Sequence, residues 1–254
     1  MKFGIDGVNK NIKSGLVGIG GVNKNLKEVY VGIGGVNRLV WSAVVAGGVG
    51  RLYHCDYGTD KNYELNIDTL ATISTASSPS GLPFGIGGIN ARLYHCDSGT
   101  DKNYELNIDT LATINTVNSP FTSPFGIGGI SDRLYHCDFG ANKNYELNID
   151  TLATINTAAS PSTAPTGIGG INNRLYHCDR DTDYNYELNI NTLATINTVN
   201  SPSTYPIGIG GVNDRLYHCD RGTNKNYELN INTLATINIV SSPSTVPSGI
   251  GGVK

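Results

Sequence analysis

The sequence predicts an all-β protein, a five-bladed β-propeller preceded by a small β-meander. Three observations predict this class. The hexapeptide Arg-Leu-Tyr-His-Cys-Asp occurs five times, each copy begins 41 residues after the last, and every unit holds four strand-like segments without a helical pattern. A fixed period near 40 residues is typical of propellers and solenoids, and four strands in about 40 residues make one propeller blade.

The second copy shows the four strands in order. A glycine-rich run comes first, the invariant hexapeptide second, an alternation of apolar and polar residues third, and a segment rich in Thr, Ile and Val last. These segments are Phe84–Asn90, Arg92–Asp97, Asn103–Ile108 and Leu111–Val117. Turn-forming Gly, Asp, Asn and Pro residues separate them. A parallel β-helix is the competing architecture, but its coils are usually shorter and lack a proline-bounded loop after every fourth strand.

The unit resembles a known class of propeller repeats. Gly-Ile-Gly-Gly, Leu-Tyr-His-Cys-Asp and Lys-Asn-Tyr-Glu-Leu-Asn-Ile-Asp-Thr-Leu are similar to the NHL and YVTN repeats, over roughly residues 44–253. His-Cys stands where that class usually has Val-Ala. The resemblance implies a fold rather than an activity, because members of the class have unrelated functions.

Residues 44–254 are expected to form the propeller, and the sequence suggests how the ring closes. A sixth copy of the first-strand sequence, Gly249–Val253, follows the fifth blade, whereas the segment before the first copy, Val44–Val49, is degenerate. We expect the C-terminal copy to complete the first blade, which ties the chain ends together and leaves no open sheet edge there.

Residues 1–43 follow a different repeat. Phe3–Asn9, Val17–Asn23 and Val31–Asn37 recur every 14 residues, and Gly-Gly between apolar runs predicts hairpins. This module carries a net charge of +4 against −7 for the remainder. Its dispersed charges come without an aromatic platform, so they are interpreted as solvated hairpin faces and predict no nucleic-acid partner.

The same module resembles the glycine-rich repeats of prophage-encoded tail-associated proteins in Firmicutes. The matching stretch runs from Leu16 to Val31 and ends in Leu39-Val-Trp41. The resemblance implies attachment or oligomerisation through residues 1–43, with other tail or particle proteins as partners and association with a virion.

The sequence offers no catalytic constellation. The five cysteines, histidines and glutamates are copies of single positions, and acid–base chemistry needs groups in different environments. Adjacent His and Cys on a strand point to opposite faces, which is a poor arrangement for a metal site. We therefore expect free buried cysteines, structural histidines, no metal, no cofactor and no enzymatic activity. These residues are Cys55, Cys96, Cys137, Cys178 and Cys219, His54, His95, His136, His177 and His218, and Glu64, Glu105, Glu146, Glu187 and Glu228.

No apolar run is long enough to span a membrane, and Asp6 and Lys10 interrupt any signal-peptide core. Synthesis in the cytoplasm without a signal peptide is expected.

The candidate binding site lies where the copies differ. The position after the second strand and the loop between blades both vary, and in an up-and-down blade both lie at the same rim. The candidate ligand-binding residues are Tyr57, Phe139, Arg180, Tyr205 and Arg221. The opposite rim carries Asp68, Asp109, Asp150, Asn191 and Asn232, which vary only between two turn-forming residue types. Loops on a rigid scaffold often carry recognition, but drift of surface loops explains the same variation.

Two functions follow. The first is a non-enzymatic binding protein, associated with a phage tail or particle, which holds a cell-surface glycan or protein at the variable rim. The alternative is a structural adaptor or repeat scaffold without a ligand of its own.

Overall fold

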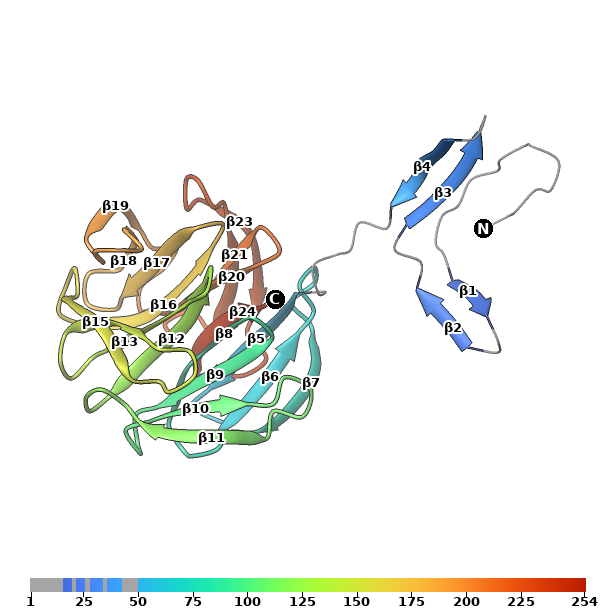
Figure 1. The fold of residues 1–254 in the computed structure, drawn as a ribbon. Helices are drawn as coiled ribbons and strands as arrows, with labels where there is room; N and C mark the ends of the chain where they lie inside the picture. Colours follow the sequence, from blue (N-terminus) through green and yellow to red (C-terminus); the bar gives the residue numbers. More distant parts are fainter. Residues whose placement is uncertain (1–15, 20–21, 26–27, 34–35, 43–49) are drawn as a thin grey trace. The chain divides into compact units, whose positions relative to one another are not determined.

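The computed structural model describes residues 16–19, 22–25, 28–33, 36–42 and 50–254. All regular elements in these ranges are strands (Figure 1). The expected all-β class and the five four-stranded blades are confirmed. The chain divides into two compact units between Val49 and Gly50.

The first unit contains two antiparallel hairpins. Strands β1 (Leu16–Ile19) and β2 (Val22–Asn25) form one, and β3 (Glu28–Ile33) and β4 (Val36–Ser42) form the other. The pairing runs up to Ile19 opposite Val22 in the first hairpin and Ile33 opposite Val36 in the second. The first expected repeat, Phe3–Asn9, and the degenerate strand Val44–Val49 lie outside the described residues.

The second unit contains five antiparallel sheets of four strands, listed here from the channel outward. The first blade is β24 (Pro247–Val253), β5 (Arg51–Asp56), β6 (Lys61–Leu65) and β7 (Thr72–Ser77). The second is β8 (Pro83–Ile89), β9 (Arg92–Asp97), β10 (Lys102–Leu106) and β11 (Thr113–Asn118). The third is β12 (Pro124–Ile130), β13 (Arg133–Asp138), β14 (Lys143–Leu147) and β15 (Thr154–Ala159). The fourth is β16 (Pro165–Ile171), β17 (Arg174–Asp179), β18 (Tyr184–Leu188) and β19 (Thr195–Asn200). The fifth is β20 (Pro206–Val212), β21 (Arg215–Asp220), β22 (Lys225–Leu229) and β23 (Thr236–Ser241).

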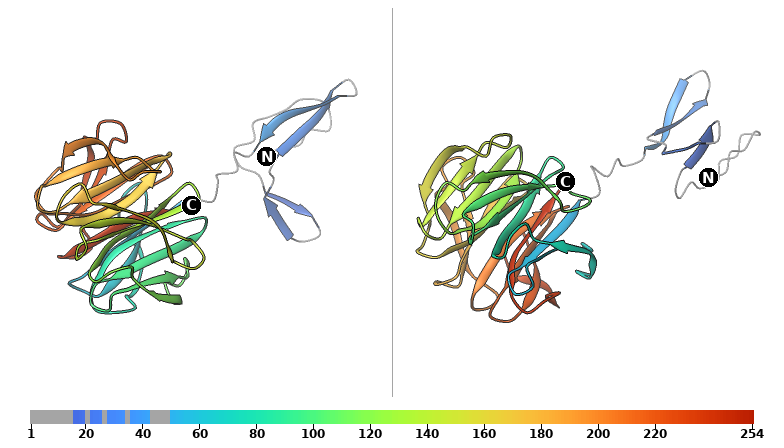
Figure 2. Two further views of the ribbon diagram at one scale, coloured as in Figure 1. Left: turned by 60° about the vertical axis from the view of Figure 1, so that its left-hand side comes forward. Right: turned by 90° about the horizontal axis from the view of Figure 1, so that it is seen from below.

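The two ends of the propeller chain meet in its first blade. Strand β24 pairs with β5, with Ile250 opposite His54 and Val253 opposite Arg51. The red C-terminal strand therefore lies beside the blue start of the ring in Figure 2. The C-terminal copy of the glycine-rich run supplies the inner strand of the first blade, and every blade is a complete four-stranded sheet.

Glycines allow the inner strands to approach one another closely. A Cβ atom on Gly85 would lie 2.7 Å from the backbone nitrogen of Ile127 and 2.8 Å from the Cα of Gly126. Any side chain at this position would collide with the backbone of the next blade. The repeated glycines thus set the small radius of the ring.

The core lies between adjacent blades rather than inside each sheet. Between the first two blades, Tyr53, Cys55, Leu93 and Leu106 pack in one cluster, each at most 1% exposed. Equivalent clusters fill the other four interfaces. Burial of this apolar surface is the main force that holds each blade to its neighbour.

The fourth strand begins later than its sequence pattern predicts. In the second blade Leu111 belongs to the preceding turn, with a left-handed φ of 58°, and β11 begins at Thr113. The Asn107 side chain accepts hydrogen bonds of 2.9 Å from the backbone N–H groups of Asp109 and Thr110. This turn directs Leu111 inward, where it is 4% exposed.

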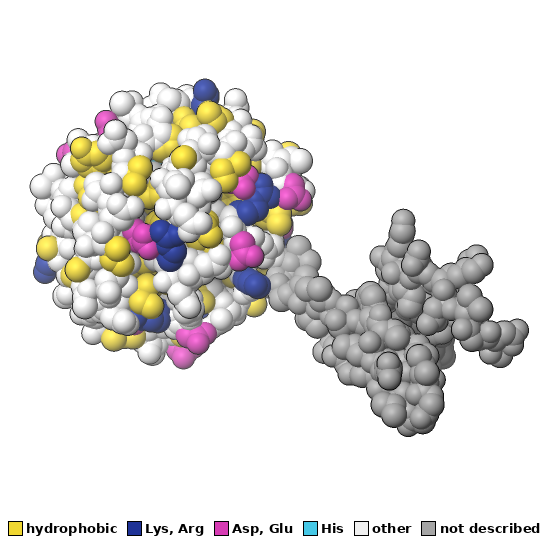
Figure 3. All heavy atoms as spheres, turned by 90° about the horizontal axis from the view of Figure 1, so that it is seen from above, with side chains coloured by type: hydrophobic (Ala, Val, Ile, Leu, Met, Phe, Trp, Pro, Cys, Tyr) yellow, Lys and Arg dark blue, Asp and Glu magenta, His cyan; other side chains and the backbone are white. Residues whose placement is uncertain are grey.

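The outer strands face solvent. One isoleucine per blade is about 60% exposed on them, at Ile73, Ile114, Ile155, Ile196 and Ile237. On the face drawn in Figure 3, charged side chains lie in separate spots, often with opposite charges side by side. No helix in the described part of the chain has the length and hydrophobicity to cross a membrane.

Candidate functional site: two mouths of the channel

The five candidate binding residues come together at one mouth of the channel. Tyr57, Phe139, Arg180 and Arg221 follow the second strands of their blades, and Tyr205 precedes β20. Antiparallel pairing brings the loop after a second strand and the loop between blades to the same end of the ring. All five side chains are half-buried. We call this set the aromatic–arginine mouth.

The two arginines of this mouth lie between aromatic rings. The guanidinium carbon of Arg180 is 4.7 Å from the ring centroid of Phe139 and 5.2 Å from that of Tyr205. That of Arg221 is 5.6 Å from Tyr205 and 5.4 Å from Tyr57. Such cation–π contacts contribute about 0.5–2 kcal/mol each, depending on how far they are desolvated.

The contacts above form a row from Phe139 to Tyr57, and two buried phenylalanines connect the two ends of this row. Tyr57 stacks on Phe84 with ring centroids 5.8 Å apart, Phe84 lies 4.0 Å from Phe125, and Phe125 lies 5.1 Å from Phe139. The aromatic and guanidinium groups thus form a closed circle. The channel beneath Phe84 and Phe125 has a free volume of only about 10 Å³, so side chains close it at this end.

The loops between blades adopt two arrangements at this mouth. In two of them, residues with left-handed backbone donate their N–H to an aspartate of the preceding blade: Ser123 (φ 65°) to Asp101, and Tyr205 (φ 76°) to Asp183, each at 2.8 Å. In the other three, the N–H of the equivalent residue bonds to the aspartate that ends the second strand of the next blade. Those pairs are Leu82 with Asp97, Ala164 with Asp179 and Val246 with Asp56.

The first arrangement leaves two buried carboxyl oxygens without a partner among the described residues, Oδ2 of Asp138 and Oδ2 of Asp220. Burial raises the pKa of Asp138 to about 7 and also raises the pKa of Asp220. Left-handed backbone at a bulky tyrosine and unpaired buried carboxyls are local strain. The two carboxyls immediately precede Phe139 and Arg221 in the chain, so the strain adjoins residues of the aromatic–arginine mouth.

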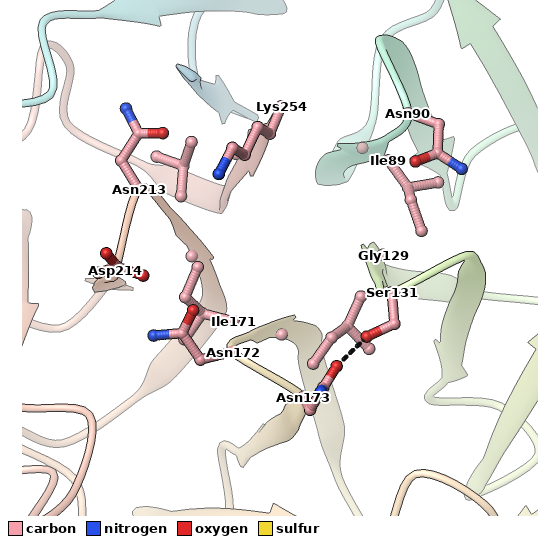
Figure 4. Close-up of a pocket in the computed structure, with 16 residues that line it drawn as sticks. Ile89, Asn90, Gly129, Ser131, Ile171, Asn172, Asn173, Asn213, Asp214 and Lys254 are labelled. Carbon is pink, nitrogen blue, oxygen red and sulfur yellow. Dashed lines mark hydrogen bonds between the residues drawn. The ribbon is translucent and has the colours of Figure 1, made fainter. Parts of the chain in front are cut away.

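The opposite mouth is open. A cavity of about 270 Å³ lies there, lined by the turns between first and second strands (Figure 4). Its polar lining includes Asn90, Ser131, Asn172, Asn213 and Lys254. The sequence predictions did not include this site. The sequence signal for this site is the two-residue turn between the first and second strands, which varies although the strands are nearly invariant. The turn reads Asn-Ala, Ser-Asp, Asn-Asn and Asn-Asp in successive blades.

The invariant charged residues tie the blades together. Arg51 forms a bidentate pair with Glu64 of its own blade, with both N···O distances 2.7 Å, and reaches Asp109 of the next blade at 2.6 Å. Arg51 holds the pKa of Glu64 below its usual value. In the third blade, Arg133 donates the equivalent hydrogen bond to the amide oxygen of Asn191 at 2.7 Å. An amide oxygen can therefore replace the carboxylate oxygen as the acceptor. The Asp/Asn variation of that rim is thereby explained.

The repeated histidines have a structural role, as expected. His95 is fully buried, and its Nε2 lies 3.2 Å from the hydroxyl of Ser78 in the loop before its blade. All five histidines have an equivalent serine. Burial lowers the pKa of His95 to about 4. All five cysteines are free and buried.

No protein-family model matches the chain, and no curated protein matches its sequence. Solved structures match the fold. A chain of the nidogen/laminin complex has a TM-score of 0.58 at 13% identity, over 80% of this chain and 98% of that one. Glutaminyl cyclase of Myxococcus xanthus has a TM-score of 0.53 at 12% identity, over 62% and 76%. A streptogramin B lyase has a TM-score of 0.51 at 17% identity, over 90% and 82%. These neighbours are NHL/YVTN-like and lyase-like β-propellers, so the expected resemblance holds at the level of the fold.

The expectation that the protein is not an enzyme is wrong as an inference from the repeats. Glutaminyl cyclase and streptogramin B lyase are enzymes with this fold. A propeller ring therefore does not exclude catalysis, since chemistry resides in residues grafted onto a fold rather than in the fold itself.

Proposed function

We propose that this protein binds a protein partner through the aromatic–arginine mouth. The observation that carries the proposal is the closed circle of tyrosine, phenylalanine and arginine side chains at one end of the ring. Phe84 and Phe125 are buried, and the other five members are half-buried. Aromatic residues and arginine are enriched in protein interfaces and in their hot spots. A preorganised surface of this kind loses little conformational entropy on binding.

The geometry favours a protein over a glycan at this mouth. Sugars stack on free faces of aromatic rings, but here neighbours cover them. Phe139 lies between Phe125 and Arg180, and Tyr205 lies between Arg180 and Arg221. The channel below is closed. The half-buried side chains therefore stand over a channel end with almost no free volume, and a shallow surface of this kind suits another protein surface.

The wider role that we propose is recognition by a particle-associated protein. Residues 1–43, which resemble tail-associated repeats, would join the propeller to a phage tail or related particle, and the mouth would contact a cell-surface protein. A chain of similar fold occurs in the nidogen/laminin complex, which contains two different proteins.

A structural scaffold is the second candidate, and one observation favours it. Phe139 and Tyr205 pack against a buried cluster that includes Phe84, Phe125 and Ile250. The circle therefore closes the channel whether or not it binds anything.

Binding is tested with substitutions taken from other blades of the same chain. Ser98 and Ser123 occupy the positions equivalent to Arg180 and Tyr205, so the scaffold already accepts serine at both places. We expect R180S/R221S, and separately Y57S/F139S/Y205S, to reduce adsorption of the labelled full chain to candidate host cells at least about tenfold. A matched control at the other mouth is A91N, which copies Asn173; it should adsorb normally.

Two further treatments identify the partner class. Protease treatment of the cells should abolish adsorption, and periodate oxidation of their glycans should not. Full adsorption by both serine variants would show that this mouth is not the binding surface. Sensitivity to periodate alone would replace a protein partner by a glycan. Absence of adsorption to any candidate cell would favour the scaffold.

A further inference from the structure

The open mouth of the channel has the features of a separate binding site. We propose that its cavity binds one residue of a neutral, polyhydroxylated ligand, such as a terminal pyranose sugar. The cavity lies at the end of the ring opposite the aromatic–arginine mouth, so this proposal is independent of the proposed function. Its volume of about 270 Å³ corresponds to roughly nine water molecules at about 30 Å³ each, which is the scale of a single sugar ring.

The cavity has an apolar wall. Ile89, Ile130, Ile171 and Val212 end the inner strands of four successive blades and line the cavity. Figure 4 labels Ile89 and Ile171 among them. Ile89, Ile130 and Val212 are at most 6% exposed because they pack between blades, so the edges of these side chains, together with the half-buried Ile171, form the apolar wall. A pyranose has C–H groups on one face, and such a face gains free energy when it leaves water for an aliphatic surface.

Amide groups stand above this wall. The side chains of Asn172 and Asn213 line the cavity and have no hydrogen-bond partner among the described residues. Asn90 donates to Asp132 at 3.0 Å and Asn173 accepts from Ser131, so each keeps part of its capacity. An amide carries both donors and an acceptor, and a sugar hydroxyl carries both as well. This match favours hydroxyl groups over groups that only donate or only accept.

The charge of the lining indicates a neutral ligand. One cation, Lys254, and one carboxylate, Asp214, are the charged groups among the residues that line the cavity. The carboxylate of Asp132 lies just outside the lining, where the Asn90 amide donates to it, so the cavity faces charges of both signs and no cluster of one sign. A neutral ligand also avoids the cost of removing an ion from water.

The backbone holds these groups in fixed positions. Asn172 and Asn173 have φ values of 51° and 59°, and Asn213 and Asp214 have 49° and 63°. Two successive left-handed residues define the tight type I′ hairpin turn. The amides therefore stand on short, stiff turns at the ends of paired strands and lose little freedom on binding.

The lining also differs from blade to blade, although the strands on either side are nearly invariant. The turns read Asn-Ala, Ser-Asp, Asn-Asn and Asn-Asp. A symmetric ring would present the same groups on every side. This asymmetry gives one ligand orientation an advantage over its rotated alternatives, as specific recognition requires.

The test uses the full chain and a panel of methyl glycosides of the common hexoses and N-acetylhexosamines. Saturation-transfer NMR with each glycoside at about 10 mM detects dissociation constants near 1 mM. We expect at least one glycoside to bind. N172G/N213G removes both unpartnered amides while glycine tolerates the left-handed backbone, and affinity should fall at least about tenfold. A91G is the matched control, because Ala91 has a φ of 57° in the equivalent turn but does not line the cavity; its affinity should stay within about twofold.

Three results would overturn the proposal. One is the absence of binding by every glycoside, and another is unchanged affinity in N172G/N213G. The third is preferential binding of inorganic phosphate or of free amino acids at the same concentration, which would assign the cavity to a charged ligand. Melting temperatures of both variants within a few degrees of the native value establish that the ring is intact. Neither variant touches the aromatic–arginine mouth, so cell adsorption should not change, and the two proposals fail separately.

Discussion

The phenol hydroxyl of Tyr217 donates a 2.7 Å hydrogen bond to the backbone carbonyl of Ile67, where the fifth blade meets the first. The same bond joins every adjacent pair of blades, for example Tyr94 to Ile149 at 2.8 Å. Burial raises the pKa of these tyrosines above the usual range, so the hydroxyl remains a donor at all ordinary pH values. The interface between the fifth and first blades, which closes the ring, thus has the same hydrogen bond as the interfaces between blades that follow one another in the sequence.

Because the interfaces are equivalent, the same mutation at two of them should lower the free energy of unfolding by the same amount. Y217F and Y94F each remove one donor and leave a carbonyl unpaired, so each should destabilise the protein by about 1 kcal/mol. Urea denaturation of the two variants measures the difference. A cost for Y217F several times that for Y94F would show that the closing interface is not equivalent to the others.

Removal of residues 247–254 should be far more damaging. It deletes β24 and exposes the edge of β5, together with the surface that covers Ile250 and Val253, which are 2% and 4% exposed in the ring. Loss of several buried apolar side chains costs more than a typical domain can lose. Thermal unfolding and light scattering should show a large fall in melting temperature or aggregation. Removal of Lys254 alone is the control and should be tolerated; normal melting of the long truncation would contradict the closure mechanism.

Acid should unfold the protein steeply. Burial lowers the pKa of His54 to about 4 and that of His136 to about 3, so each buried histidine is neutral when folded and gains a proton on unfolding below about pH 6.5. Five histidines therefore favour unfolding as the pH falls from about 6.5 to 4. Asp138 and Asp220 act in the opposite direction, because their pKa values are raised in the fold. The five histidines outnumber these two aspartates, so unfolding takes up protons on balance in this range and the free energy of unfolding falls as the pH falls.

Urea midpoints measured between pH 4 and 7 test this expectation. H136Q removes one titrating group, so the slope of the free energy of unfolding against pH should fall by the equivalent of about one proton. The histidines of the other four blades should still contribute to the slope. A flat profile over this range would mean that the histidines are protonated in the folded ring.

The cysteines should be inert until the ring opens. All five are 0% exposed, and burial raises the pKa of the Cys96 thiol well above its usual value. Because the thiolate is the reactive form, a thiol reagent at pH 8 should react with none in the native protein and with five after denaturation without reductant. Fewer than five reactive thiols in the unfolded chain would reveal a disulfide.

Much of this architecture could be predicted from the sequence, because each strand is specified by a short local pattern and the same patterns recur in all five repeats. The second strand is predicted at Arg92–Asp97 and found there. The fourth strand begins later than its sequence pattern predicts, because the side chain of Asn107 stabilises a turn that takes Leu111 out of the strand. The contacts of Arg180 and Arg221 with their aromatic neighbours depend on ring curvature, which brings together residues from different blades. The polar cavity was missed for the same reason, since it exists only once five inner strands have closed into a ring.

Near-identical blades also affect how the chain assembles. The surface that one blade presents to the next, with its tyrosine, cysteine and leucine cluster, recurs at each interface. A blade therefore makes the same contacts with a blade of another molecule as with its own neighbour, and only chain connectivity determines which partner it meets first. Exchange of blades between molecules during refolding competes directly with ring closure. We therefore expect dilution during refolding to favour the closed monomeric propeller over linked chains.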